Sequence, residues 1–346
     1  MTQSAETDGG RGAGAVHVRP LVRRLRAAVQ GTVFLLVLWG GFDLWRFASH
    51  LEAGRVPPFA KPVSPEGFLP IGSLMSLKLW VTTGAWDPWH PAGMVILGAA
   101  LAVSLALRKS FCGWICPVGT LSELLWRLGR RLFGRTFALP RWADLPLRSL
   151  KYLLLAFFLW IILVQMPVPA IRAFLANDYW KVSDLKMLHV FTGMSATTAL
   201  VLAALVALSL VTKAFWCRYL CPYGALTGLL AAAGPLRVRR DADRCINCGS
   251  CARNCPALLP VDRKASIASP ECIGCLTCVS RCPAPGALDA ALPRRIVIPP
   301  LLFAAAVVAV FFGTLLAARL AGHWHSGVSG AEYLRLAPSL LGLAHP

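Results

Sequence analysis

The sequence predicts a mainly α-helical protein, a multi-pass transmembrane bundle of about five spans that carries one small cysteine-rich α+β module. Three observations predict this class. Hydrophobic residues make up 56% of the 346 positions and the mean hydropathy is +0.60, which is too apolar for an ordinary soluble domain. Five apolar segments have or approach the length that crosses a hydrocarbon core about 30 Å thick. All twelve cysteines fall into four short motifs.

The five apolar segments lie at about 28–48, 90–107, 150–166, 189–211 and 296–318. The first is too long for a cleavable signal, and no small-residue cleavage site follows it. With the N-terminus inside, the three inner segments hold 26 of the 35 Lys and Arg residues. This asymmetry follows the positive-inside rule and predicts an N-in, C-out protein. The net charge of +19 is therefore expected to orient helices and not to bind nucleic acid.

The chain divides into four predicted parts. They are a disordered basic N-terminal segment (1–27), a membrane domain with an internal repeat (28–234), the cysteine-rich module (235–293), and a last transmembrane helix with an outer tail (294–346). The predicted topology puts all twelve cysteines on the cytoplasmic side of the membrane, where thiols stay reduced and metal clusters can be loaded.

The cysteine-rich module contains two runs of the form Cys-x2-Cys-x2-Cys-x3-Cys-Pro. This is the ligand pattern of paired [4Fe–4S] clusters, in which the fourth cysteine of each run ligates the other cluster. The expected ligands are Cys245, Cys248, Cys251 and Cys282 for the first cluster, and Cys272, Cys275, Cys278 and Cys255 for the second. A pair of zinc ribbons is the alternative. Two identical runs, each closed by proline, favour iron–sulfur clusters, and the module is thus ferredoxin-like.

Two shorter motifs, Cys-x3-Cys-Pro-x-Gly-x-Leu, recur at an offset of 105 residues and hold Cys112 with Cys116, and Cys217 with Cys221. Cysteines four apart share one helix face, and both pairs follow helices that run inward. The repeat is therefore expected to bring four thiols together at the membrane boundary. They suit a third metal centre or a redox-active dithiol. The alternative is that each cysteine packs as a small apolar residue while Cys-Pro ends its helix.

Ionisable residues near the outer face are candidates for proton transfer with quinol. Asp43 lies near the outer end of the first span, where burying an acid is expensive, and a local pair with Arg46 is its alternative role. His90 and His189 are candidates because histidine is the residue type best suited to exchange protons near neutral pH, and their alternative role is interfacial packing. No predicted span carries a histidine in its middle, so a pair of haem ligands is not expected.

Two stretches and the two long runs carry a family resemblance. Phe111-Cys-Gly-Trp-Ile-Cys-Pro-Val-Gly-Thr and Phe215-Trp-Cys-Arg-Tyr-Leu-Cys-Pro-Tyr-Gly-Ala-Leu resemble the membrane polyferredoxins of the NapH/YccM/NosR/MauN group, over roughly residues 65–290. The resemblance implies a bacterial inner-membrane protein with two [4Fe–4S] clusters. The resemblance to the NapH-like members further implies quinol oxidation that feeds a respiratory reductase. The long flavinylated outer domain of NosR-like proteins is absent from this sequence.

The predicted function is electron transfer between the quinone pool and a redox partner, such as another electron-transfer subunit. The protein would act as a quinol dehydrogenase subunit, with no other substrate chemistry. One alternative is a reductase that handles copper or matures a metalloenzyme through the Cys-x3-Cys-Pro cysteines. Another is a redox-sensing or assembly scaffold without turnover. Arginines and lysines around the clusters are expected to dock an acidic partner.

Overall fold

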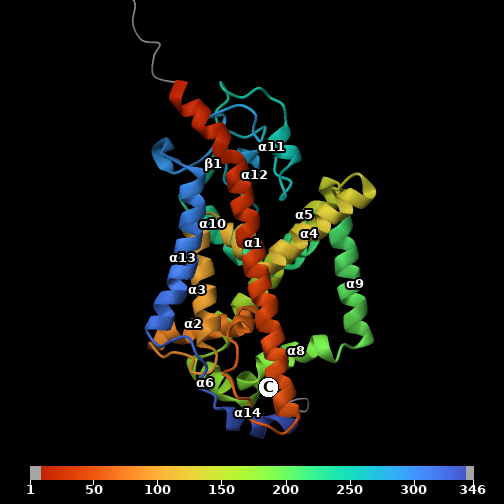
Figure 1. Ribbon diagram of the computed structural model, residues 1–346, viewed down its shortest axis with the longest axis vertical. Helices are drawn as coiled ribbons and strands as arrows, with labels where there is room; N and C mark the ends of the chain where they lie inside the picture. Colours follow the sequence, from red (N-terminus) through yellow and green to blue (C-terminus); the bar gives the residue numbers. More distant parts are fainter. Residues whose placement is uncertain (1–8, 340–346) are drawn as a thin grey trace, which may run out of the picture. The chain divides into compact units, whose positions relative to one another are not determined.

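The computed structural model describes residues 9–339, which are mainly helical and form two compact units. Unit 1 contains the residues up to Val33, together with Leu101–Lys151 and Leu208–Val310. Unit 2 contains Phe34–Ala100, Tyr152–Ala207 and the residues from Phe311 onward. Five helices, labelled in Figure 1, belong partly to each unit: α1 (Gly9–Glu52), α3 (Pro91–Ala106), α5 (Arg141–Leu159), α9 (Ala196–Val211) and α13 (Pro300–Leu320).

These five helices overlap the five apolar segments that the sequence predicts to span a membrane. Three stretches are long and apolar enough to do so, namely Pro20–Glu52, Trp142–Gln165 and Pro300–Leu320. A fourth span would combine α8 (Ser183–Thr192) with α9, although the two helices are bent by 82° where they join. The apolar helix α3 is shorter, with 16 residues. By length and composition these are the helices of a membrane protein, while the count of five spans stays a prediction.

The first helix begins well before the first apolar segment. Residues 1–27 are predicted to be disordered, but α1 is helical from Gly9 onward, and residues 1–8 lie outside the described part of the chain. Val22 and Arg26 are buried within unit 1, so tertiary packing supports the helix there. A stretch rich in glycine and arginine shows little apolar periodicity, so its composition gave no sign of this packing.

The internal repeat appears in unit 1 as two similar helix–turn–helix segments. In the first, α3 leads to the π-helical turn η2 (Phe111–Ile115) and then to α4 (Pro117–Phe133). In the second, α9 leads to the π-helical turn η4 (Trp216–Leu220) and then to α10 (Pro222–Ala233). Each motif proline is the first residue of its second helix, where its missing N–H and fixed φ are tolerated.

The cysteine-rich module of unit 1 contains one antiparallel sheet with the strand order β2-β1-β3-β4. Val238 lies opposite both Ile267 and Ala290, and all three side chains are buried on one face of the sheet. One short helix follows each cysteine loop. The elements are β1 (Arg237–Arg240), α11 (Ser250–Arg253), β2 (Ser266–Ile267), α12 (Thr277–Ser280), β3 (Leu288–Ala291), η5 (Pro293–Arg295) and β4 (Val297–Ile298).

Unit 2 contains short helices between the ends of the long ones. Two apolar clusters form its core, one around Leu44, Phe47 and Tyr333, the other around Ile162 and Ile171. The further elements of this unit are η1 (Ser64–Phe68), α2 (Pro70–Thr83), η3 (Trp160–Gln165), α6 (Val168–Ala176), α7 (Asp178–Lys181), α8, α14 (Gly330–Leu336) and η6 (Ala337–Ser339).

Candidate metal-cluster sites

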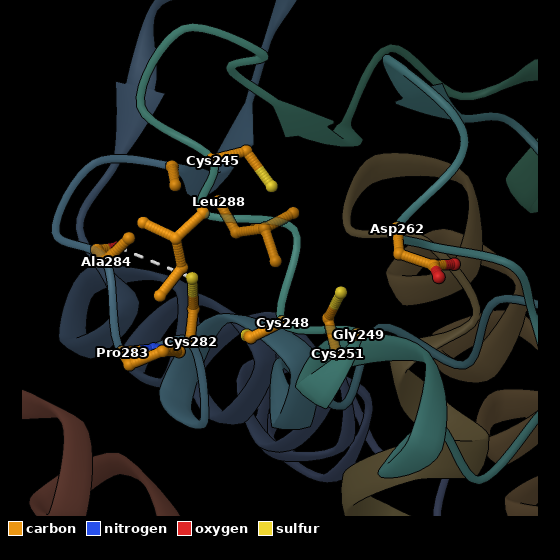
Figure 2. A pocket seen from close by; sticks show the side chains of 11 residues that line it. Cys245, Cys248, Gly249, Cys251, Asp262, Cys282, Pro283, Ala284 and Leu288 are labelled. Carbon is orange, nitrogen blue, oxygen red and sulfur yellow. Dashed lines mark hydrogen bonds between the residues drawn. The ribbon is translucent and has the colours of Figure 1, made fainter.

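The first cavity of the cysteine-rich module is lined by four cysteines that come from both long runs. Three belong to the first run and one to the second. Its cysteines are Cys245, Cys248, Cys251 and Cys282. Figure 2 shows the sulfur atoms of Cys245, Cys251 and Cys282 on different sides of this space. The structure thus brings together the set that the sequence assigns to the first cluster.

The second cavity is lined by the complementary four cysteines. They are Cys272, Cys275, Cys278 and Cys255. Each run therefore contributes three cysteines to one cavity and its last cysteine to the other. Two cavities with the same donor set fit two clusters of one type, and four thiolates are the usual ligands of a [4Fe–4S] cluster.

The backbone of both loops bends in the same way around its cavity. Asn247 and Gly249 have positive φ values of 53° and 66°, and Gly274 and Leu276 have values of 57° and 52° at the matching positions. Such left-handed residues turn successive N–H groups toward a common point, which suits an anionic ligand. The Asn247 N–H and then the Arg240 side chain lower the pKa of Cys245, as expected where a thiolate ligand is stabilised.

The two cavities differ in their exposure to solvent. Cys248 is exposed and the neighbouring Ile246 side chain is 65% exposed, so the first cavity opens at the surface of unit 1. In the second cavity, burial raises the pKa of Cys255 to about 12 and that of Cys278 well above its usual value. Neutral thiols in such a place become ligands only when a metal displaces their protons. The first site is therefore accessible to a protein partner, and the thiols of the second site lie deeper in unit 1.

The four cysteines of the short motifs also converge. Cys112 lies in η2 and Cys217 in η4, while Cys116 and Cys221 precede α4 and α10. Burial raises the pKa of Cys116 most, and the nearby Cys112, Cys217 and Cys221 raise it further. The sulfur of Cys112 lies 3.7 Å from the hydroxyl oxygen of Thr227 in the second repeat. The sequence predicts this meeting of thiols, and the structure has it inside unit 1.

The first short motif packs directly against the loop of the second cavity. The Trp114 indole N–H donates a hydrogen bond of 3.0 Å to the carbonyl oxygen of Gly274. A Cβ atom on Gly113 would lie 2.4 Å from the carbonyl oxygen of Ile273, so only glycine permits this approach. Gly274, also at a positive φ, faces Ser110 closely. The four-thiol group and the second cavity are therefore joined through one short contact.

Basic residues beside the short motifs fasten them to the cysteine-rich module, a role that sequence reasoning missed. Arg108 donates to the carbonyl oxygens of Ala231 and Ser269. Lys213 donates to the carbonyl oxygen of Cys255 at 3.3 Å. The positive-inside rule accounts for such residues as helix anchors. Their position immediately before the two motifs was the available signal of a further role.

The three candidate proton-transfer residues lie in unit 2, and no contact joins them among the described residues. Asp43 pairs with Arg46 at 3.3 Å, which is the local pair named as its alternative role. His189 is half-buried and packs against Gly193. His90 is 1% exposed, and its Nδ1 lies 3.3 Å from a carboxylate oxygen of Glu66. Only His90 is thus part of a larger polar group.

That polar group was not predicted, because its members come from segments that are far apart in the sequence. Lys61 donates to Glu66 at 3.3 Å and to Asp184 at 2.5 Å. The Nε2 atom of His90 lies 2.7 Å from the carbonyl oxygen of Trp180, so Nε2 carries a proton and donates it there. The side chains of Lys61, Glu66, His90 and Asp184 are at most 3% exposed. Their mutual pairing makes such burial possible.

The family models that match this chain cover the two halves of the repeat and the cysteine-rich module separately. A family model described as a 4Fe-4S binding domain matches residues 89–136 and again 195–240, which are the two halves of the repeat. A second model, described as a 4Fe-4S dicluster domain, matches residues 237–283. No solved structure matches this chain.

Three curated relatives show how far the similarity extends. The chain is 41% identical to YccM of Escherichia coli, named as an electron transport protein, over 92% of this chain and 91% of the relative. It is 29% identical to the methylamine utilization ferredoxin-type protein MauN of Methylorubrum extorquens, over 68% of this chain and 73% of the relative. It is 31% identical to the ferredoxin-type protein NapH of Escherichia coli, over 48% of this chain and 55% of the relative.

Proposed function

The chain belongs to the family of ferredoxin-type electron transport proteins that includes YccM and NapH, and we propose that it passes electrons between the quinone pool and a redox partner protein. In this proposal it binds two [4Fe–4S] clusters, which supply one-electron transfer. The observation that carries the proposal is the pair of cavities, each lined by four cysteines shared between the two runs. We assign those eight cysteines as the cluster ligands.

The first cavity is the proposed point of exchange with the protein partner. Ile246 and Cys248 expose this site at the surface. Close by, Arg281 precedes the ligand Cys282, and its pKa is lowered by burial and then by the charges of Arg23, Arg130 and Arg127. Several cations that repel one another at one surface favour an acidic partner, which would relieve that repulsion. An acidic redox protein is therefore the proposed docking partner.

The second cavity is the proposed link to quinone. Its loop is joined to the four-thiol group through Trp114 and Gly113. We propose that Cys112, Cys116, Cys217 and Cys221 form a third redox centre, either as metal ligands or as redox-active thiols, and that quinone exchanges electrons at this layer. His90 remains a candidate for proton transfer, with Asp43 and His189 as weaker ones.

The proposed location is a bacterial inner membrane with both clusters on the cytoplasmic side. Of the 35 Lys and Arg residues, 26 lie in the sequence of unit 1, which contains all twelve cysteines. The positive-inside rule then favours unit 1 as the cytoplasmic part. The five helices shared by the two units support five spans with the N-terminus inside.

The test uses the full chain in lipid nanodiscs, with cluster reduction followed by absorbance and EPR. Menaquinol or ubiquinol is expected to reduce the clusters, or the dithionite-reduced protein to reduce quinone. Replacing Cys245 or Cys272 by serine should remove the signal of the cluster concerned. Dithionite without quinone serves as the control for loaded clusters. The proposal fails if clusters that dithionite reduces exchange no electrons with either quinone in either direction.

A second candidate function is favoured by the convergence of four thiols, which are soft ligands for copper. In this case the protein would reduce copper, or a metal site under assembly, with electrons from the clusters. Copper(II) reduction that is lost in Cys112→Ser and Cys217→Ser, while electron exchange between quinol and the clusters persists, would favour this function.

A further inference from the structure

The surroundings of the four-thiol group include a buried cation that no acidic group neutralises. Lys109 is 3% exposed, and among residues 9–339 it forms no ion pair or hydrogen bond with another side chain or with the backbone. Its ammonium nitrogen lies 3.4 Å from the position that a Cβ on Gly224 would occupy. Burying an unpaired ammonium is costly, so a protein retains one where an anion accompanies it.

The group that lies beside the Lys109 ammonium is the sulfur atom of Cys221. The backbone N–H of Gly224 donates to the sulfur of Cys221 at 3.3 Å. Lys109 therefore lies beside the Cys221 sulfur, on the side where the two repeats meet. Nearby, Lys151 is fully buried, but its ammonium is neutralised by Glu271 at 2.6 Å. Of these two lysines, only Lys109 lacks an acidic partner among the described residues.

A buried hydroxyl lies near a second thiol of the group. The Ser122 hydroxyl is buried, with no hydrogen-bond partner among the described residues. Burial raises the pKa of the Cys217 thiol to about 12, and the Ser122 side chain acts in the opposite direction on this thiol. A backbone N–H that donates to sulfur, as that of Gly224 does to Cys221, is the kind of hydrogen bond that tunes iron–sulfur clusters.

The donor set of this group matches that of the two cavities. Each half of the repeat supplies two cysteines, and four thiolates are the usual ligands of a [4Fe–4S] cluster. The family model that matches both halves is described as a 4Fe-4S binding domain. These two observations favour a cluster over a single Zn²⁺ or Cu⁺ ion.

From these observations we infer that Cys112, Cys116, Cys217 and Cys221 hold a third iron–sulfur cluster, whose negative charge is balanced by the buried ammonium group of Lys109. The inference rests on the proposed electron-transfer function and specifies its third centre. Four thiolates around a cubane core of charge +2 leave a net charge of about −2. Exchange with the cluster of the second cavity then moves one electron, with no bond made or broken and no proton transferred.

The inference assigns Lys109 a measurable role as the group that sets the reduction potential of this centre. A nearby positive charge stabilises the reduced, more negative form of a cluster, so it raises the potential. Lys109→Gln should therefore shift one of three cluster potentials to a more negative value and leave the other two unchanged. Lys109→Arg keeps the charge and should restore the potential. Lys264→Gln, at an exposed lysine of the cysteine-rich module, is the matched control.

The experiment combines iron and sulfide analysis with an EPR-monitored redox titration of the full chain, expressed with iron supplied and purified without oxygen. The expected result is about twelve irons per chain in the parent protein and about eight in Cys112→Ser and Cys217→Ser. Should the cysteine variants fail to assemble, the reduction potentials of Lys109→Gln and Lys109→Arg still test the inference, because these two variants keep every cysteine. About eight irons in the parent protein, alone or with one zinc or copper, would overturn the inference.

Failure of this inference and failure of the proposed function give different results. Twelve irons with a potential that depends on Lys109, in a protein that quinol cannot reduce, would retain the third cluster and reject the quinone link. Eight irons in a protein that quinol reduces normally would do the opposite. A Lys109→Gln variant with all potentials unchanged would also count against the inference.

Discussion

Trp114 donates its indole hydrogen bond to the carbonyl oxygen of Gly274 across 3.0 Å, and the indole is completely buried. Trp114 lies in the turn between Cys112 and Cys116, and Gly274 lies between Cys272 and Cys275. One hydrogen bond thus joins the short motif to the loop of the second cavity. The link gives the tryptophan inside a cysteine motif a structural role, because it fixes the position of one set of cysteines relative to another.

Trp114→Phe should therefore weaken the contact between the short motif and the loop of the second cavity, and leave most of its apolar packing. The phenyl ring keeps most of the apolar contact, but the buried Gly274 carbonyl loses its donor, and we expect about 1–3 kcal/mol less stability. Denaturant unfolding in detergent, followed by loss of cluster absorbance, measures this difference. Trp142→Phe, at a side chain that is 81% exposed, is the control and should change little. Equal effects of the two substitutions would argue against a specific role for the Trp114 bond.

Gly113→Ala tests the close approach on the other side of the same turn. The added Cβ would lie 2.4 Å from the Ile273 carbonyl oxygen, which is backbone and cannot rotate away. We expect the loop of the second cavity to shift and about four irons to be lost, while the EPR signal of the first cluster persists. Gly98→Ala adds the same methyl group within α3, where nothing lies within 4 Å, and should keep its full iron content. Unchanged iron in Gly113→Ala would show that the turn and the loop are not in contact.

The pairing of Arg26 with Glu123 predicts a dependence of stability on pH. Both residues are buried, and Arg127 bonds to the other carboxylate oxygen at 2.5 Å. Burial alone would raise the pKa of Glu123, but Arg26 and then Arg127 outweigh it, and the pKa falls below its usual value of 4.5. A lowered folded-state pKa gives stability that is present above pH 4.5 and is lost as the pH falls through the folded-state value.

Glu123→Gln should accordingly cost about 3 kcal/mol at pH 7, because it leaves Arg26 buried without a counter-charge. The difference from the parent protein should shrink below pH 4.5, where the parent loses the same charge. Chemical unfolding at pH 7 and pH 4, measured on both proteins side by side, separates this effect from the general acid lability of clusters. Glu52→Gln, at an exposed glutamate, is the control. A difference that grows on acidification would contradict the assignment.

The cysteine spacing anticipated that three cysteines of one long run and the last cysteine of the other line each cavity, because this ligand pattern crosses between two clusters. The repeat anticipated that the short motifs meet, whereas the role of all twelve cysteines as cluster ligands stays a prediction. The apolar segments likewise anticipated the five long helices. The docking of the η2 turn was not predictable, since it depends on Gly113 and Trp114 meeting a loop about 160 residues away. Lys109 was counted only as part of the charge balance, and its burial appears only once the two repeats pack together.

The buried ionic group of unit 2 could not be predicted for the same reason. Lys61 and Asp184 stand 123 positions apart in segments without a periodic pattern, yet their side chains meet at 2.5 Å. His90 was selected from the sequence because histidine can transfer protons. Its neighbours Lys61, Glu66 and Asp184 belong to no sequence motif, so they could not be selected in the same way.

Lys61 is the only base with an ordinarily permanent charge in that group, and its removal predicts a large loss of stability. Burial would lower its pKa, but Asp184 and then Glu66 raise it above its usual value of 10.5. Its contribution is therefore fully present below pH 10.5 and is lost only as the pH rises through the still higher folded-state pKa. From pH 6 to pH 9, Lys61→Met should lower the free energy of unfolding by a constant amount, about 3–5 kcal/mol.

Lys61→Met leaves two buried carboxylates facing one another, so the double variant Lys61→Met/Asp184→Asn should be less destabilised than the single variant. Unfolding of the three proteins at pH 7 measures this coupling. Lys186→Met, on the same helix as Asp184 but half-buried, is the control. If the double variant were less stable than Lys61→Met, the electrostatic account of unit 2 would be wrong. The iron content should stay unchanged in all variants, because every cluster ligand belongs to unit 1.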